Sequence, residues 1–94
     1  MASPNASSNS GSLEEQVQEL INHHNHGQFE VILSKVETLI ALYPKAAVLF
    51  NIKGIALKNK GDLEGAINSY KQAIKIQPDF ADAYLNLGAA MTNK

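Results

Sequence analysis

The chain has 94 residues, 8 lysines, 9 acidic residues and a formal net charge of -1, with no arginine and no cysteine. This length fits one small domain, and the balanced charge argues against a globally basic nucleic-acid binder. The lack of cysteine excludes a disulfide framework and a cysteine nucleophile. No apolar run approaches the roughly 18 residues of a membrane span, and no signal-peptide stretch begins the chain. We therefore expect no membrane association and, by default, a cytoplasmic protein.

Residues 1–12 are nearly all small or polar. Such a segment buries too little apolar surface to offset the entropy lost on ordering, so we expect a disordered leader, either native or added. Ser12 and Glu15 have the spacing of a capping box, in which each residue bonds the other's backbone at a helix start. The folded domain, residues 13–94, should therefore begin near Leu13.

From that point the sequence repeats itself with a period of 34 residues. The offset pairs Gly27 with Gly61 and Pro44 with Pro78, and it keeps apolar residues in phase between them. An internal repeat of this length is typical of solenoid folds. The copies divide the domain into residues 13–46, 47–80 and 81–94, and the third copy holds only the first half of the unit.

Each full copy contains two stretches with apolar residues at helical spacing, separated by a glycine and ended by a proline. No stretch has the alternating pattern of a strand. The expected helices are Leu13–His26, Gln28–Leu42, Ala46–Asn59, Leu63–Ile76 and Phe80–Asn93.

The middle copy resembles the tetratricopeptide repeat (TPR), a helix–turn–helix unit with small and aromatic residues at set positions. Phe50 and Gly54 fill first-helix positions, and Ala66 and Tyr70 fill second-helix positions, where small residues let two helices approach closely. The last copy matches through its first helix only. The first copy departs from the pattern, because Leu20 stands where glycine is expected and should hold its two helices further apart.

This resemblance implies an all-α, right-handed solenoid of five helices arranged as antiparallel hairpins. It also implies that the first helices of the repeats line a groove for extended or helical segments of partner proteins. Carried over by alignment, the groove residues are Glu14, Val17, Gln18, Ile21, His24, Asn25, Val48, Asn51, Ile52, Ile55, Lys58, Asn59, Asp82, Leu85, Asn86 and Ala89.

One branch of the family binds a terminal carboxylate through a set of Lys, Asn and Arg side chains. The corresponding positions here carry Val17, Ile21, Ile52, Asp82 and Asn86, so none of them matches. We therefore expect a mixed groove, apolar at its centre and edged by amides, whose partners present apolar side chains rather than a free C-terminal carboxylate.

Catalytic chemistry finds no support in the sequence, so we expect neither an enzyme nor a cofactor. The three histidines, His23, His24 and His26, cluster at one helix end away from most of the serines. His23 and His26 are close enough on a helix to share a metal, but two imidazoles without a further ligand make a weak site, and we expect none. His24, on the groove, would make binding sensitive to pH near about 6–7.

The leading functional prediction is a protein–protein interaction module, a fragment of a longer repeat or multidomain protein. The alternative is a docking or regulatory segment of an enzyme whose catalytic domain lies outside this chain. A third reading, a nucleic-acid-binding helical repeat, needs a basic groove, and Lys58 is the single lysine among the groove residues.

The half repeat at the C-terminal end predicts self-association. Its helix should pack on the preceding helix with one flank and leave the other without a partner. A second copy of the chain would then cover that flank and form a homo-oligomer. The residues expected on this flank are Ala83, Leu87, Ala90 and Met91.

Overall fold

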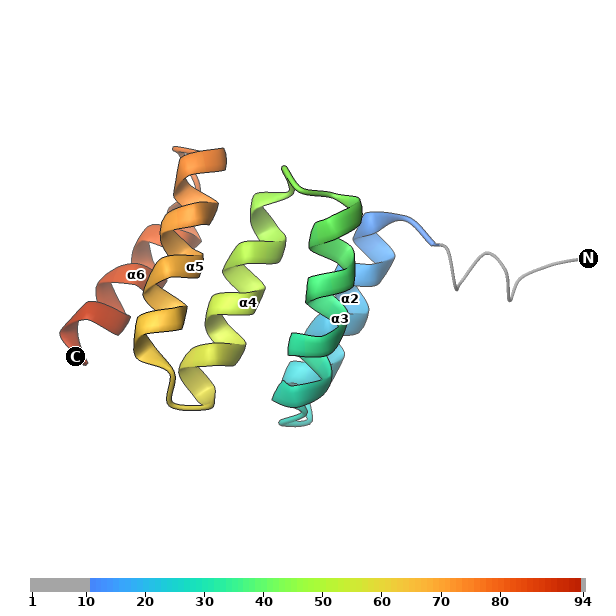
Figure 1. The fold of residues 1–94 in the computed structure, drawn as a ribbon, viewed down its shortest axis with the longest axis horizontal. Coiled ribbons are helices and arrows are strands. Elements are labelled where there is room, and N and C mark those ends of the chain that lie inside the picture. The colour runs from blue at the N-terminus through green and yellow to red at the C-terminus, as the bar shows by residue number, and fades with distance from the viewer. Residues whose placement is uncertain (1–10, 94) are drawn as a thin grey trace, which may run out of the picture.

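The computed structural model describes residues 11–93, which fold into five helices with no strand among them (Figure 1). Residues 1–10 of the expected leader lie outside the described residues. All five predicted helices are confirmed, and each end lies within one residue of the prediction, because the outermost residues cap the helices instead of continuing them. The helices are α2 (Leu13–Asn25), α3 (Phe29–Leu42), α4 (Ala47–Asn59), α5 (Leu63–Ile76) and α6 (Ala81–Thr92).

The 34-residue period is visible in the helix bounds. The first helices α2, α4 and α6 begin 34 residues apart, and so do the second helices α3 and α5. Consecutive helices run antiparallel and stand side by side along the molecule (Figure 1). The first helices also contact one another, α2 with α4 and α4 with α6, and so form one layer. The predicted all-α solenoid is confirmed.

Two glycines close the turns inside the hairpins. Gly27 has a φ of 70° and Gly61 a φ of 91°, the left-handed region that a side chain disfavours. After Gly61, the Asp62 amide donates to the Leu57 carbonyl at 2.8 Å, and Gln28 donates to His23 at 2.9 Å after Gly27. This pairing satisfies carbonyls at the helix end and turns the chain back on itself.

Side-chain caps begin two of the helices. The predicted capping box is present at α2, where the amides of Ser12 and Glu15 each donate to the other's side chain at 3.2 Å. At α5, Asp62 Oδ1 accepts from the Gly65 amide at 2.9 Å. Helix α2 therefore begins at Leu13.

The core of the described residues consists of three clusters of buried side chains. The first cluster joins α2, α3 and α4, and the other two join α4, α5 and α6. Tyr70 is buried at the crossing of α4 and α5, with Ala66 one helical turn before it. The buried members of the first cluster are Leu20, Ile32, Val36, Leu39, Leu49, Ile52 and Ala56.

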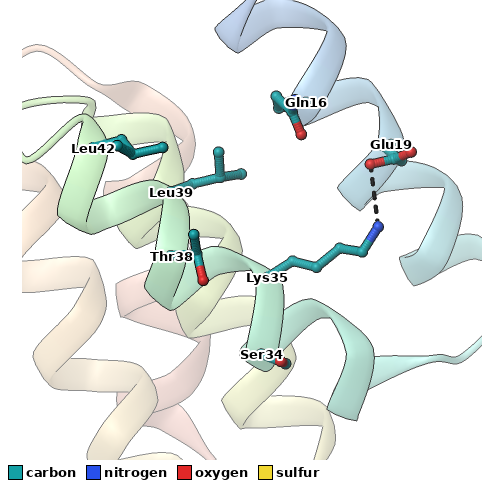
Figure 2. Close-up of a pocket in the computed structure, with 7 residues that line it drawn as sticks. All are labelled: Gln16, Glu19, Ser34, Lys35, Thr38, Leu39 and Leu42. Atoms are coloured by element: carbon teal, nitrogen blue, oxygen red, sulfur yellow. Dashed lines mark hydrogen bonds and ion pairs between the residues drawn. The ribbon is translucent and has the colours of Figure 1, made fainter. Parts of the chain in front are cut away.

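Contacts between α2 and α3 are sparser than those between α4 and α5, as expected for Leu20 at the glycine position. A cleft of about 380 Å³ lies between the two helices, and Figure 2 shows the side chains that line it. Lys35 of α3 bridges it to Glu19 of α2 at 3.2 Å. The cleft is lined by Gln16, Glu19, Ser34, Lys35, Thr38, Leu39 and Leu42.

The prediction for the free flank of α6 is wrong for three of its four residues. Ala83 and Ala90 are fully buried against the preceding helices, and Leu87 packs beside them on the Tyr70 cluster. These three residues recur at helical spacing on one stripe, and that stripe faces the body of the protein. Met91 is 55% exposed and Tyr84 is 50% exposed, so the free flank lies about one residue around the helix.

None of the helices within residues 11–93 has the length and the apolar character required to cross a membrane.

Candidate functional site

The groove residues predicted from the sequence lie on the layer of first helices, which we call the first-helix face. They differ widely in exposure. Leu85 of α6 is 74% exposed and Ile21 of α2 is 41% exposed, whereas Ile52 and Asn51 of α4 are buried. Val17 and Val48 are partly buried and pack on the first core cluster. The face thus offers apolar side chains from its two outer helices and a closely packed floor from α4.

A small apolar pocket of about 90 Å³ opens between α2 and α4; we call it the apolar socket. Its floor consists of buried side chains, and Ile21, His24 and Ile55 form its rim. The socket is a partly enclosed apolar feature of the first-helix face. Its lining residues are Leu20, Ile21, His24, Ile32, Ile52 and Ile55.

Sequence reasoning missed two of the socket residues, Leu20 and Ile32. Leu20 occupies the position where the repeat pattern has glycine, and that departure was the available signal. Ile32 belongs to a second helix, which the alignment assigns to the core. It reaches the socket because it packs with Leu20 and Ile52 in the first cluster. An alignment of the residues on the first-helix face therefore does not identify the side chains at the bottom of a pocket that a second helix also lines.

Amides on this face are largely engaged within the fold. The Asn86 side chain of α6 donates to Asn51 Oδ1 of α4 at 3.0 Å, which joins the two helices. Asn59 donates from its side chain to the Ile55 carbonyl at 2.8 Å. Part of the hydrogen-bonding capacity of these amides is therefore already used within the fold.

Charges are separated along the first-helix face. Glu14 and Asp82 lie in the first turns of α2 and α6, whereas His24 and Lys58 lie in the last turns of α2 and α4. Because the first helices run parallel, one end of the face carries carboxylates and the other carries basic groups. In the part of the chain that the structure describes, Lys58 makes no ion pair.

Each of the three histidines contacts a nearby residue. His23 Nδ1 lies 2.7 Å from Gln28 Oε1, and His26 Nδ1 donates to the Asn22 carbonyl at 2.7 Å. The ring of His24 meets Phe29 edge to face, with centroids 5.6 Å apart. Across residues 11–93, no three His, Cys, Asp or Glu side chains are arranged to hold a metal ion.

Three ion pairs join neighbouring helices outside this face. Lys35 pairs with Glu19, Lys53 with Glu37 at 2.7 Å, and Lys60 with Glu30. All are partly exposed, so each contributes little to stability. Lys53 and Lys60 of the middle copy thus pair with glutamates of the first copy.

Comparison with known proteins agrees with the fold. A family model for the TPR repeat matches residues 54–94. The chain is 44% identical over 43 residues to protein FlbA of Caulobacter vibrioides and 29% identical over 66 residues to the peroxisomal targeting signal receptor of Candida albicans. It is 36% identical over 47 residues to the uncharacterized protein MJ0572 of Methanocaldococcus jannaschii.

These alignments cover 46%, 70% and 50% of this chain, in the same order. They cover 7%, 11% and 55% of the three relatives, so the chain spans only a part of each. TPR repeats are typically non-catalytic modules for protein–protein interaction. The TPR repeat model thus matches residues 54–94, and the hairpin architecture and the 34-residue spacing extend the likeness to this repeat over the other described helices.

Proposed function

We propose that the first-helix face binds an extended or helical segment of a partner protein, mainly through apolar contacts. The observation that carries this proposal is the apolar socket, flanked on the same face by the exposed Ile21 and Leu85. Exposed apolar side chains gathered on one face commonly mark interaction sites. A relative that is by name a receptor for a targeting signal supports recognition of a peptide segment.

The electrostatics of the face favour internal segments over free chain ends. A terminal carboxylate is best held by clustered Lys and Arg side chains, and this chain has no arginine. Lys58 is the single lysine among the predicted groove residues. A bound peptide with a free C-terminus and its amidated form should therefore have similar affinities.

Panning a phage library of random dodecapeptides on the full chain tests the proposal. Ile21→Glu should abolish enrichment, because it places a charge on the rim of the apolar socket. Val31→Glu is the matched control, since Val31 of α3 is 37% exposed, close to the 41% of Ile21, and lies outside the first-helix layer. Enrichment of the same peptides on both variants would contradict the proposal.

We propose further that the parent is an interaction protein rather than an enzyme that uses this domain for docking. The binding chemistry of the domain is the same in both cases. The two differ in the coding sequence around the domain, where additional 34-residue repeats would support the first reading and a catalytic domain the second.

A second proposed function is self-association through the exposed stripe of α6, Tyr84, Gly88 and Met91. In the preceding repeat the equivalent stripe of α4 is Phe50, Gly54 and Leu57, and α5 covers it. A Cβ added at Gly54 would touch Tyr70, whereas one at Gly88 would meet nothing within 4 Å. The stripe on α6 thus keeps the residues of a helix-packing surface without a helix upon it.

A two-fold pairing of α6 helices would cover both stripes at once. With the axis near Gly88, Tyr84 of one copy would face Met91 of the other, a favourable sulfur–aromatic contact. Sedimentation velocity at about 100 μM should detect a dimer that Met91→Glu dissociates. Leu85→Glu, which adds the same charge on another side of α6, should leave the dimer intact. A monomer at this concentration would contradict the proposal.

A further inference from the structure

We propose that the apolar socket accepts one leucine, isoleucine or methionine side chain of the partner segment, and that this segment carries an acidic residue beside that anchor. The inference rests on the proposed function, because it names the chemistry of the ligand that the first-helix face would bind. It depends on three properties of the site: the size of the socket, its rigidity and the charge beside it.

The volume selects an aliphatic side chain. The socket holds about 90 Å³, whereas an apolar cavity that binds benzene has about 150 Å³. An aromatic ring is therefore too large unless the walls move, and a branched or unbranched aliphatic chain fits. His24 is the one polar side chain in the lining, and a buried water needs two to four polar partners. Water is thus held weakly and readily displaced.

The buried side chains at the bottom of the socket are held in place by the packing of the core. Leu20 and Ile32 are each 1% exposed and Ile52 is 9% exposed, and all three belong to the first core cluster. Closing the socket would require this packed core to rearrange, which close packing opposes. Because the socket is preformed, little binding free energy is lost in ordering its side chains, and the anchor should contribute strongly to affinity.

The charge beside the socket indicates which type of residue should stand next to the anchor in the partner segment. Lys58 lies three residues after Ile55 on α4, so the two side chains share one face of the helix. Lys58 has no ion-pair partner among residues 11–93, and His24 on the rim adds a second basic group at the same end. The nearest carboxylate of the face on α2, Glu14, is nearly two helical turns before Ile21. An acidic residue next to the anchor complements this end, and a basic residue is repelled.

The proposal is tested with the same random dodecapeptide library, panned on the wild-type chain and on two variants that keep the fold. Ile21→Ala enlarges the socket from its exposed rim, and Lys58→Glu reverses the charge. Wild-type protein should enrich peptides with Leu, Ile or Met within about four residues of Asp or Glu, one helical turn. Ile21→Ala should shift the anchor toward Phe, and Lys58→Glu should replace the acid by Lys or Arg. Val31→Ala should change neither preference.

Fluorescence anisotropy with a synthetic, amidated copy of an enriched peptide makes the test quantitative. Replacing the anchor by Ala should weaken binding to wild-type protein by about tenfold or more, the loss expected when a buried aliphatic side chain is truncated. Replacing it by Phe should weaken binding to wild-type protein by a similar factor and weaken binding to Ile21→Ala by much less. Thermal unfolding of each variant confirms that the fold persists.

The outcomes separate this inference from the proposed function. One contrary result is a set of enriched peptides that bind the wild-type chain and not Ile21→Glu, yet contain no aliphatic anchor. Another is a set of peptides selected on Lys58→Glu that still contain the acidic residue. Either result would overturn the inference and leave the proposed function standing. A library that yields no enriched peptide would overturn both. If Ile21→Glu and Leu85→Glu each dissociate an oligomer of the chain without peptide, Leu85 of a second copy fills the socket. The inference that a partner segment fills it would then also be wrong.

Discussion

The ring of Tyr70 lies directly on Gly54. A Cβ atom built on Gly54 would come within 2.7 Å of Tyr70 Cδ1 and closer still to Cε1, nearer than real carbon atoms approach. Tyr70 is 1% exposed, so the ring has no open space to move into. This contact sets the closest approach between α4 and α5 and explains why the two positions combine a small residue with an aromatic one.

Gly54→Ala should lower the free energy of unfolding by about 1–3 kcal/mol, because the added methyl overpacks the crossing. Gly88→Ala is the matched control, since Gly88 occupies the same repeat position with nothing near its missing Cβ. Alanine is the better helix former, so this variant should be more stable by up to about 1 kcal/mol. Urea unfolding, at a protein concentration at which the chain is monomeric, measures both free energies of unfolding, and an equal effect of the two substitutions would contradict the packing account.

Burial also affects the chemistry of Tyr70. Desolvation raises the pKa of its phenol from 10.0 to about 12. The resulting stability is fully present below pH 10 and is lost as the pH rises toward 12, because the unfolded chain ionises first. Between these values the free energy of unfolding should fall by about 2–3 kcal/mol more for wild-type protein than for Tyr70→Phe. Parallel pH profiles for the two proteins would show that the phenol is not desolvated.

The hydrogen bond between Asn51 and Asn86 should couple α4 to α6. Asn51 is 7% exposed, so Asn86→Ala leaves its side-chain oxygen without a protein partner and should cost about 1–2 kcal/mol. In a double-mutant cycle with Asn51→Ala, the coupling energy should be about 0.5–1.5 kcal/mol. Asn68→Ala, at an exposed position of α5, serves as the control. Additive effects of the two substitutions would mean that the bond contributes nothing.

Stoichiometric zinc should not raise the melting temperature. A metal raises it only by binding the folded state, and within residues 11–93 no three His, Cys, Asp or Glu side chains are arranged to hold one. Differential scanning fluorimetry with and without zinc provides the measurement. A clear rise that disappears in His23→Ala and His26→Ala would show that these two imidazoles bind the metal.

The sequence predicts the fold almost completely because the residues that start and end the helices are recognisable from the local sequence, and several of them recur in the repeat. Gly27 and Gly61 end helices at equivalent positions, and Pro44 and Pro78 follow the second helices. Ser12 and Asp62 cap their helices at backbone amides three residues ahead. Such signals act over a few residues, so they can be read without knowing the packing.

The candidate site is predictable only in part, since it depends on contacts between helices. Alignment finds the exposed Ile21 and Leu85, but it does not show that Leu20 and Ile32 line a socket together with Ile21. Alignment also assigns the wrong stripe of α6 to the free flank: Ala83 and Met91 are both apolar, and only the packing shows that the first is buried and the second exposed. A change of one position on a helix turns a side chain by about 100°, which reverses such an assignment.

The central claim, that the first-helix face binds a partner segment, is tested most directly by NMR. The ¹⁵N-labelled full chain is titrated with an enriched, amidated dodecapeptide, and chemical-shift changes of the backbone amides are mapped on the structure. The account predicts the largest changes around the socket, at Ile21 and Ile55, and along α6 at Leu85, with little change at Val31 of α3 and Lys71 of α5. Changes concentrated on α3 and α5 instead would contradict it.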